Sequence, residues 1–212
     1  MKKVILAMAA ALLFAACCQT EQKSTAADPA EVVMNNILSR KSVRSYTGDT
    51  IPDAVVEKLL RAAMAAPSGR NIQPWCFVVL NDTSRYDEIF GDNFNMRMYK
   101  QSAVVVVLCA DTTVVRPPRD NPDAPAVQQP NGLWRDDMGA VTENLLLAAE
   151  AHGLGACWTA CYPYPDRMEP VRHALGLPAT VVPYCVVPIG YPAGDEQPKD
   201  KWDPSRIHYG KW

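Results

Sequence analysis

The stretch AAPSGRNIQPWCFVVL (residues 65–80) contains the transition that decides the fold of this chain. Its start continues an apolar helical pattern, and its end is a short apolar run typical of a buried strand. Between the two lies a polar loop, residues 67–74, which begins and ends with proline. This loop carries four hydrogen-bonding side chains: Ser68, Arg70, Asn71 and Gln73. We therefore expect a helix, a loop suited to binding and a core strand in direct succession.

Outward from this loop, helical and apolar strand patterns alternate along the chain. We expect helices over residues 30–38, 52–64, 86–90, 134–152 and 166–175. We expect strands over residues 76–80, 103–110 and 180–188, the last interrupted by Pro183. The run 103–110 is continuous and β-branched, which is typical of a central strand covered on both faces. The alternation predicts one sheet with helices on both faces.

Residues 114–132 form a proline-rich segment in which we expect no regular element. Its prolines are Pro117, Pro118, Pro122, Pro125 and Pro130. A loop of this length in a compact domain is usually functional or disordered. Apolar residues in the segment and at its C-terminal edge could cover a flat ligand: Val114, Val115, Val127, Leu133 and Trp134. We therefore interpret the segment as a mobile lid.

The N-terminus is similar to a bacterial lipoprotein signal. Lys2 and Lys3 precede an apolar run over residues 4–14, and small residues lead directly to Cys17. We expect a signal peptide over residues 1–16, lipidation of Cys17 and attachment to the cell envelope. An ordinary secretory signal, or cleavage before Cys18, is the alternative. Residues 17–29 then form a flexible tether, and residues 30–212 form one domain.

Composition and the remaining cysteines exclude several classes of function. The net charge of −2 provides no electrostatic footprint for nucleic acid. His152, His173 and His208 are scattered, so no metal site is expected. Three cysteines lie in apolar strand-like runs and are expected to be core residues: Cys76, Cys109 and Cys185. Cys157 and Cys161 lack CxxC spacing, and we expect free thiols.

Two cationic clusters are candidates for binding an anion. The first is RKSVR (residues 40–44), which presents Arg40, Lys41, Ser42 and Arg44 within one turn of chain. Guanidinium forks and a neutral donor together suit a phosphate. The second is PKDK (residues 198–201), with Lys199 and Lys201. Taken separately, a solvated helix end and a plain surface tail explain them equally well, whereas together they could converge on one anion.

A glycine-containing segment, GLGACWT (residues 153–159), is the third candidate. Its two glycines would let the backbone approach a flat ring closely. The alternative is a helix C-cap and a tight connection, which explains Gly153 but explains Gly155 and Trp158 less well. Three acidic residues of the long helix are interpreted as caps and solvated charge: Asp136, Asp137 and Glu143.

Taken in order, these motifs resemble the FMN-dependent nitroreductase family. The motifs are RKSVR (40–44), APS (66–68) with NIQPW (71–75), GLGACW (153–158), GYP (190–192) and PKDK (198–201). The likeness covers residues 32–201. It implies an α+β, nitroreductase-like fold with a central mixed β-sheet flanked by helices. It also implies an intertwined homodimer with FMN at the interface.

The resemblance assigns site residues by position. Arg40, Lys41, Ser42 and Arg44 would hold the FMN phosphate and ribityl chain, with Lys199 and Lys201 approaching the phosphate and the pyrimidine side. Pro67, Ser68 and Asn71 would come from the second chain, with Gln73 nearby. Trp158, Thr159 and Ala160 would face the flavin ring. Two departures are evident: Ala160 and Cys161 stand where some relatives have glutamate and glycine, and Lys201 replaces an arginine common there.

The family implies electron transfer from NAD(P)H through FMN to an electron-poor acceptor such as a nitroaromatic or a quinone. The flavin supplies the reactivity, so no protein acid or base is assigned. One alternative is a flavin-binding module without turnover. Another is a related flavin reaction, such as reductive dehalogenation or flavin fragmentation. Because NAD(P)H is scarce outside the cytoplasm, export leaves room for a different physiological donor.

Overall fold

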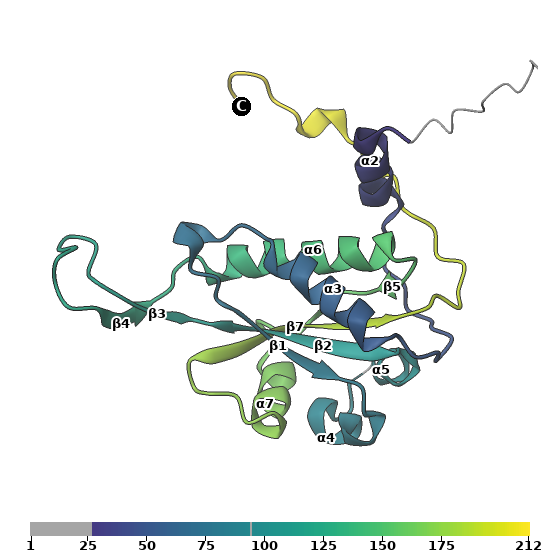
Figure 1. The fold of residues 1–212 in the computed structure, drawn as a ribbon, viewed down its shortest axis with the longest axis horizontal. Helices are drawn as coiled ribbons and strands as arrows, with labels where there is room; N and C mark the ends of the chain where they lie inside the picture. The colour runs from purple at the N-terminus through teal and green to yellow at the C-terminus, as the bar shows by residue number, and fades with distance from the viewer. Residues whose placement is uncertain (1–26, 94) are drawn as a thin grey trace, which may run out of the picture. The chain divides into compact units, whose positions relative to one another are not determined.

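The computed structural model describes residues 27–93 and 95–212. The expected signal peptide and Cys17 lie outside these residues and stay predictions. The chain divides into two compact units, residues 1–33 and 34–212. The second unit contains the sheet and every site considered below (Figure 1).

The expected helices are confirmed with small shifts at their ends. They are α2 Pro29–Ser39, α3 Asp53–Met64, α4 Tyr86–Phe90, α6 Trp134–Ala151 and α7 Pro165–Ala174. Pro52 precedes α3 as its N-cap, where its missing N–H costs nothing. A sixth helix, α5 Met96–Gln101, was not expected from the sequence. Short 3-10 turns occur at Gly69–Asn71, Thr83–Arg85 and Pro204–Arg206.

The central sheet is built around two long strands, β2 Val104–Asp111 and β7 Val181–Gly190. The strand order is β1-β2-β7-β5, with β1 Trp75–Leu80 at one edge and β5 Gly155–Ala156 at the other. The short strand β6 Thr159–Ala160 also pairs with β7. These ladders are antiparallel, and a parallel bridge between Ser42 and Ala156 makes the sheet mixed.

Strand β2 is buried on both faces from Val104 to Ala110, as its β-branched sequence predicts. Strand β1 differs from the expectation of a buried strand, because it lies at the sheet edge and none of its residues is fully buried. Strand β7 continues past Pro183 rather than breaking. A β-bulge at Tyr184, between the pairs Leu108–Cys185 and Cys109–Pro183, accommodates the proline that lacks an N–H.

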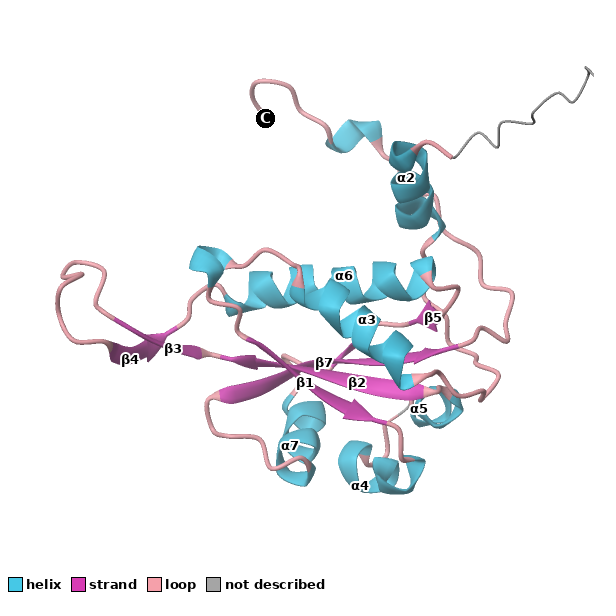
Figure 2. Cartoon of the chain, viewed as in Figure 1, coloured by secondary structure: helices cyan, strands magenta, loops and turns pink. Residues whose placement is uncertain are grey.

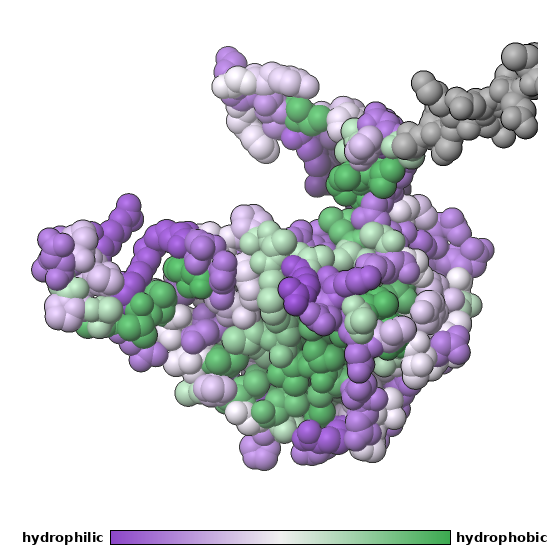
Figure 3. Space-filling view, viewed as in Figure 1, coloured by the Kyte–Doolittle hydropathy of each residue, from purple (hydrophilic) through white to green (hydrophobic). Residues whose placement is uncertain are grey.

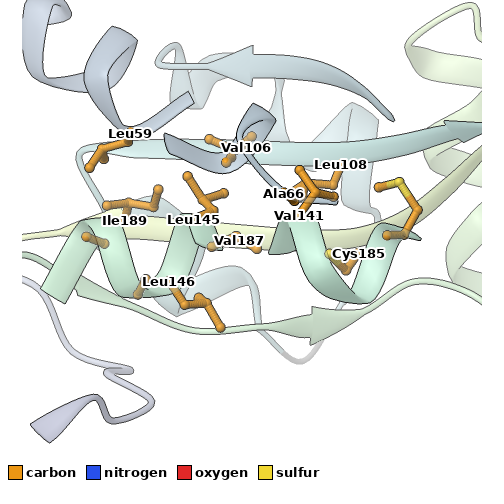
Figure 4. Close-up of a cluster of buried hydrophobic side chains, with 14 of the residues drawn as sticks. Leu59, Ala66, Val106, Leu108, Val141, Leu145, Leu146, Cys185, Val187 and Ile189 are labelled. Atoms are coloured by element: carbon orange, nitrogen blue, oxygen red, sulfur yellow. The ribbon is translucent and has the colours of Figure 1, made fainter. Parts of the chain in front are cut away.

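Helices cover both faces of the sheet, as the alternating pattern predicted (Figures 1 and 2). On one face, α3 and α6 pack on β2 and β7, and Figure 4 shows Val141 and Leu145 of α6 beside Val106 and Val187. On the other face, α4, α5 and α7 enclose a second cluster around Tyr86, Tyr99 and Ile89. These two apolar layers fix the sheet edges and loops that carry the candidate site.

The proline-rich segment corrects one expectation. It contains two strands, β3 Thr113–Arg116 and β4 Val127–Pro130, which form an antiparallel hairpin. Four of its prolines lie in the connection between the strands, and Pro130 is the last residue of β4. Counting prolines over the whole segment therefore concealed two short strands that flank them. The hairpin extends from the end of β2 (Figure 1).

Candidate functional site

The two cationic clusters line one cavity of about 370 Å3. We call it the cationic cavity, and its lining residues are Arg40, Lys41, Ser42, Arg44, Glu196, Gln197, Lys199 and Lys201. The N-terminal cluster reaches it because Ser42 bridges to Ala156 and the Val43 N–H donates to the Ala156 carbonyl. The sequence left open whether the clusters meet, and the structure brings them together.

Helix α6 holds two of these cations in place. Arg40 Nε lies 3.0 Å from Glu143 Oε1, and Lys41 Nζ lies 3.3 Å from Glu150 Oε1. Glu143 is therefore more than the solvated charge expected from the sequence, although its side chain is 45% exposed. Within the part of the chain that the structure describes, Lys199 and Lys201 have no ion-pair partner. The cavity thus combines fixed, paired cations with unpaired ones.

Glu196 is a residue of this cavity that sequence reasoning missed. Its Oε1 accepts a hydrogen bond of 3.0 Å from the Arg44 N–H. Its Oε2 is buried without a hydrogen-bond partner. The carboxylate therefore ties the C-terminal segment to the RKSVR segment. No motif in the sequence distinguished Glu196 from its charged neighbours.

A second cavity of about 200 Å3 adjoins the first, since Arg44 lines both. Its other lining residues are Asn95, Cys157, Trp158, Thr159, Ala160 and Arg167. Trp158 is 36% exposed and packs at a tilt on Tyr184. The Thr159 hydroxyl donates to the Val186 carbonyl at 2.6 Å and lies 2.7 Å from the Tyr99 hydroxyl. That hydroxyl is therefore committed to the fold rather than to a ligand.

The glycines of the 153–159 segment have structural explanations. Gly153 has a φ of +69° directly after α6, which confirms the C-cap alternative. Gly155 packs against Val43, and an added Cβ would lie 2.6 Å from the Val43 Cβ. The interpretation of Gly155 as space for a flat ring is therefore wrong, because Val43 occupies that space.

The polar loop, residues 67–74, has an unusual backbone. Arg70, Asn71 and Gln73 each have a φ of 54°, in the left-handed region that non-glycine residues rarely adopt. Ser68 Oγ accepts a 3.0 Å hydrogen bond from the Gln73 N–H, and Gln73 Nε2 donates to Asn71 Oδ1 at 2.9 Å. Such strain persists only where the surroundings enforce it, and it is typical of functional sites.

Asp137 of α6 enforces this loop conformation. Its Oδ1 accepts a 2.7 Å hydrogen bond from the Gly69 N–H, and the residue is buried. A Cβ at Gly69 would collide with the Leu133 side chain, so the loop backbone lies tightly against the start of α6. The expectation that Asp137 is solvated charge is therefore wrong. The loop residues Pro67, Ser68, Asn71 and Gln73 line neither of the two cavities within this single chain.

The described cysteines are free thiols, as expected. Cys109 and Cys185 are buried in the core, but Cys76 is exposed because β1 is an edge strand. Burial raises the pKa of the Cys109 and Cys161 thiols to about 12. Within residues 27–93 and 95–212, no group of metal-ligating side chains gathers. No helix in this same part of the chain is long and apolar enough to cross a membrane.

The fold and the cationic cavity together define an α+β protein with a cation-lined site beside the edge of its sheet. The chain belongs to the nitroreductase family, whose pattern, described as "Nitroreductase family", matches residues 37–100 and 90–191. The architecture is the nitroreductase-like fold that the motifs implied.

Individual relatives share this assignment. A protein of Methanothermobacter thermautotrophicus, provisionally described as an NADH dehydrogenase/NAD(P)H nitroreductase, is 34% identical over 85% of this chain and 87% of its own length. A crystal structure from Bacteroides thetaiotaomicron with the same provisional description has a TM-score of 0.74 and 39% identity, covering 85% of this chain and 98% of that one. The FMN reductase [NAD(P)H] of Bacillus subtilis is 24% identical over 84% of this chain and 72% of its own length.

Proposed function

We propose that this protein is an FMN-dependent oxidoreductase that takes electrons from NAD(P)H and passes them to an electron-poor acceptor such as a nitroaromatic or a quinone. The observation that carries the proposal is the cationic cavity, which gathers Arg44, Lys199 and Lys201 in a chain of the nitroreductase family. Relatives described as NAD(P)H nitroreductase and FMN reductase support the same activity.

The charges of the cationic cavity fit a flavin phosphate. Five cations line it, and three carboxylates pair with them or lie among them, which leaves two positive charges. A phosphate monoester carries a charge of about −1.5 to −2 at neutral pH, so the two match. The unpaired Lys199 and Lys201 and the Arg44 guanidinium would bind it, while Ser42 offers a neutral donor. Paired Arg40 and Lys41 would orient the site.

The flavin ring would lie in the adjoining cavity, beside Trp158 and the backbone of Thr159 and Ala160. Arg44 lines both cavities, so a phosphate in one places the ring in the other. FMN bound there supplies the hydride and electron transfer chemistry, and the chain supplies orientation and exclusion of water. The described residues include no acid or base for which the geometry assigns a proton-transfer role.

A second copy of the chain would complete this site with its polar loop. Pro67, Ser68, Asn71 and Gln73 would then reach a flavin held by the first copy, which accounts for a strained loop that lines neither cavity of its own chain. Apolar surface supports such an association. Ile37 and Leu38 are 45% and 66% exposed, and Figure 3 shows apolar residues gathered where Figure 1 places β1 and β2.

The spectrum of the purified protein tests the flavin site. The protein should be yellow, and NADH or NADPH should bleach it under anaerobic conditions. The double variant Ser42→Ala/Arg44→Gln should lose most of its FMN while remaining folded, because a donor and a phosphate fork are removed. Lys58→Gln, which removes an exposed cation of α3, is the matched control. A folded double variant with full FMN content would refute the assigned site, and a flavin that no nicotinamide reduces would indicate a binding module.

The N-terminal sequence carries the localisation proposal. We propose that Cys17 is lipidated after removal of residues 1–16 and anchors the protein to the bacterial cell envelope. The support is the charged, apolar and small-residue order before Cys17. Mass spectrometry of the native N-terminus should find acyl groups on Cys17. A mature chain that starts elsewhere without acyl groups would refute the anchor.

A further inference from the structure

A second cation-lined pocket lies at the base of the β3–β4 hairpin, with a volume of about 260 Å3. Its lining residues are Arg70, Arg116, Pro117, Pro118, Arg119 and Pro122. We propose that this arginine pocket binds the phosphate groups of the reduced pyridine nucleotide that delivers electrons to the flavin. The inference rests on the proposed function and names a specificity site for its electron donor.

The three guanidiniums of this pocket are not neutralised. Within the described part of the chain, Arg70, Arg116 and Arg119 have neither an ion-pair partner nor a side-chain hydrogen bond, and no carboxylate lines the pocket. The cationic cavity differs, since Glu143 and Glu150 pair with two of its cations. Three like charges that converge on one pocket repel one another, and an anion between them removes that repulsion.

The backbone around the pocket is fixed before any ligand arrives. Arg70 has φ 54° and ψ 25°, and the Asp137 carboxylate holds the N–H of the preceding residue, Gly69. On the hairpin side, three prolines restrict the chain that carries Arg116 and Arg119. A preorganised set of side chains loses less conformational freedom on binding, which favours affinity. The pocket therefore joins the strained polar loop to the hairpin through a common ligand.

The chemistry of three arginines selects phosphate groups. A guanidinium presents a planar fork that matches two phosphate oxygens, and several forks together suit a diphosphate or two separate phosphates. The proposed reaction uses two phosphorylated molecules, FMN and the nicotinamide nucleotide. The chain correspondingly has two cation-lined cavities that share no lining residue. With the FMN phosphate in the first, the second remains for the nucleotide.

The test compares phosphorylated and uncharged reductants on the FMN-loaded protein. The double variant Arg116→Gln/Arg119→Gln should lower kcat/KM for NADPH or NADH about tenfold or more, because charge-assisted hydrogen bonds to phosphate are lost. The same variant should leave FMN content and kcat/KM for 1-benzyl-1,4-dihydronicotinamide, which has no phosphate, unchanged. Arg61→Gln, which removes an exposed arginine of α3, should change none of these values.

The outcomes separate the pocket from the proposed function. A larger loss for NADPH than for NADH assigns the 2′-phosphate, and equal losses assign the shared diphosphate. Unchanged kcat/KM for both nucleotides, or an equal loss with the uncharged reductant, overturns the inference. Titration calorimetry with ADP-ribose gives a readout without turnover, and the double variant should lose this binding. A wild-type protein that no reductant bleaches refutes the proposed function, and the calorimetry then decides the pocket by itself.

Discussion

At the scale of single residues, Gly155 and Val43 determine how closely the RKSVR segment approaches the sheet. Gly155→Ala places a Cβ 2.6 Å from the Val43 Cβ, so the segment or the sheet edge must shift. We expect a loss of ~1–3 kcal/mol in the free energy of unfolding, as for other overpacked sites. Urea denaturation measures it. Gly139→Ala in α6 is the control, since its Cβ meets nothing within 4 Å and a gain of up to ~1 kcal/mol is expected.

The cysteines provide a second test at this scale. Cys76 is exposed, whereas Cys109, Cys157, Cys161 and Cys185 are buried. Partial burial first, and the Asp111 carboxylate second, raise the pKa of the Cys76 thiol. A raised pKa lowers the thiolate fraction at neutral pH, so iodoacetamide should label Cys76 slowly at pH 7 and faster as the pH rises. Peptide mapping by mass spectrometry should find the four buried thiols unlabelled until the protein unfolds; labelling of Cys109 in the native protein would contradict the fold.

At the scale of elements, the β3–β4 hairpin is expected to set the choice of acceptor. Replacing residues 117–126 with Asn-Gly retains the pairing of Arg116 with Val127 and favours a tight hairpin turn. We expect changed KM values for nitroaromatic and quinone acceptors with FMN content intact, because the cationic cavity lies outside the hairpin. Steady-state kinetics with a panel of acceptors measures this. An unchanged acceptor profile would make the hairpin a surface insertion and refute its role as a lid.

The elements also show where sequence reasoning succeeds and fails. Strand β2 was predictable because its β-branched run admits no other buried element, and α6 because its apolar face is long and Gly153 ends it. The hairpin and the short α5 were not, because four-residue strands and a six-residue helix gain their stability from tertiary packing rather than local pattern. Met98 and Tyr99 of α5, for example, are held by the second core cluster.

The candidate site divides in the same way. Adjacent residues such as Arg40 and Ser42 were recognisable as a motif, and the convergence with Lys199 was open to suggestion. The roles of Asp137 and Glu196 depend on contacts to Gly69 and Arg44, each 68 or more positions away along the chain. A carboxylate that holds a distant backbone N–H leaves no local signal in the sequence.

At the scale of the whole molecule, we expect a homodimer. The C-terminal segment exposes large aromatic side chains, with Trp202, Tyr209 and Trp212 at 73%, 90% and 97%. Aromatic residues are enriched at protein interfaces and often dominate their binding energy. Sedimentation of the full chain should give twice the monomer mass. Removing residues 202–212 should raise the dimer dissociation constant about a hundredfold or more, since aromatic anchors contribute ~2 kcal/mol or more each. A full-length monomer that retains FMN tightly would refute the shared site.

Helix α6 serves both halves of the site, since Asp137 holds the polar loop and Glu150 pairs with Lys41. At 1.5 Å per residue the two acids are about 20 Å apart, on one rigid helix. A single inserted residue between them would turn Glu150 about 100° around the axis and away from Lys41. Natural variation in chain length should therefore be absent between residues 137 and 150, while the hairpin tip at 117–126 should tolerate insertions and deletions freely.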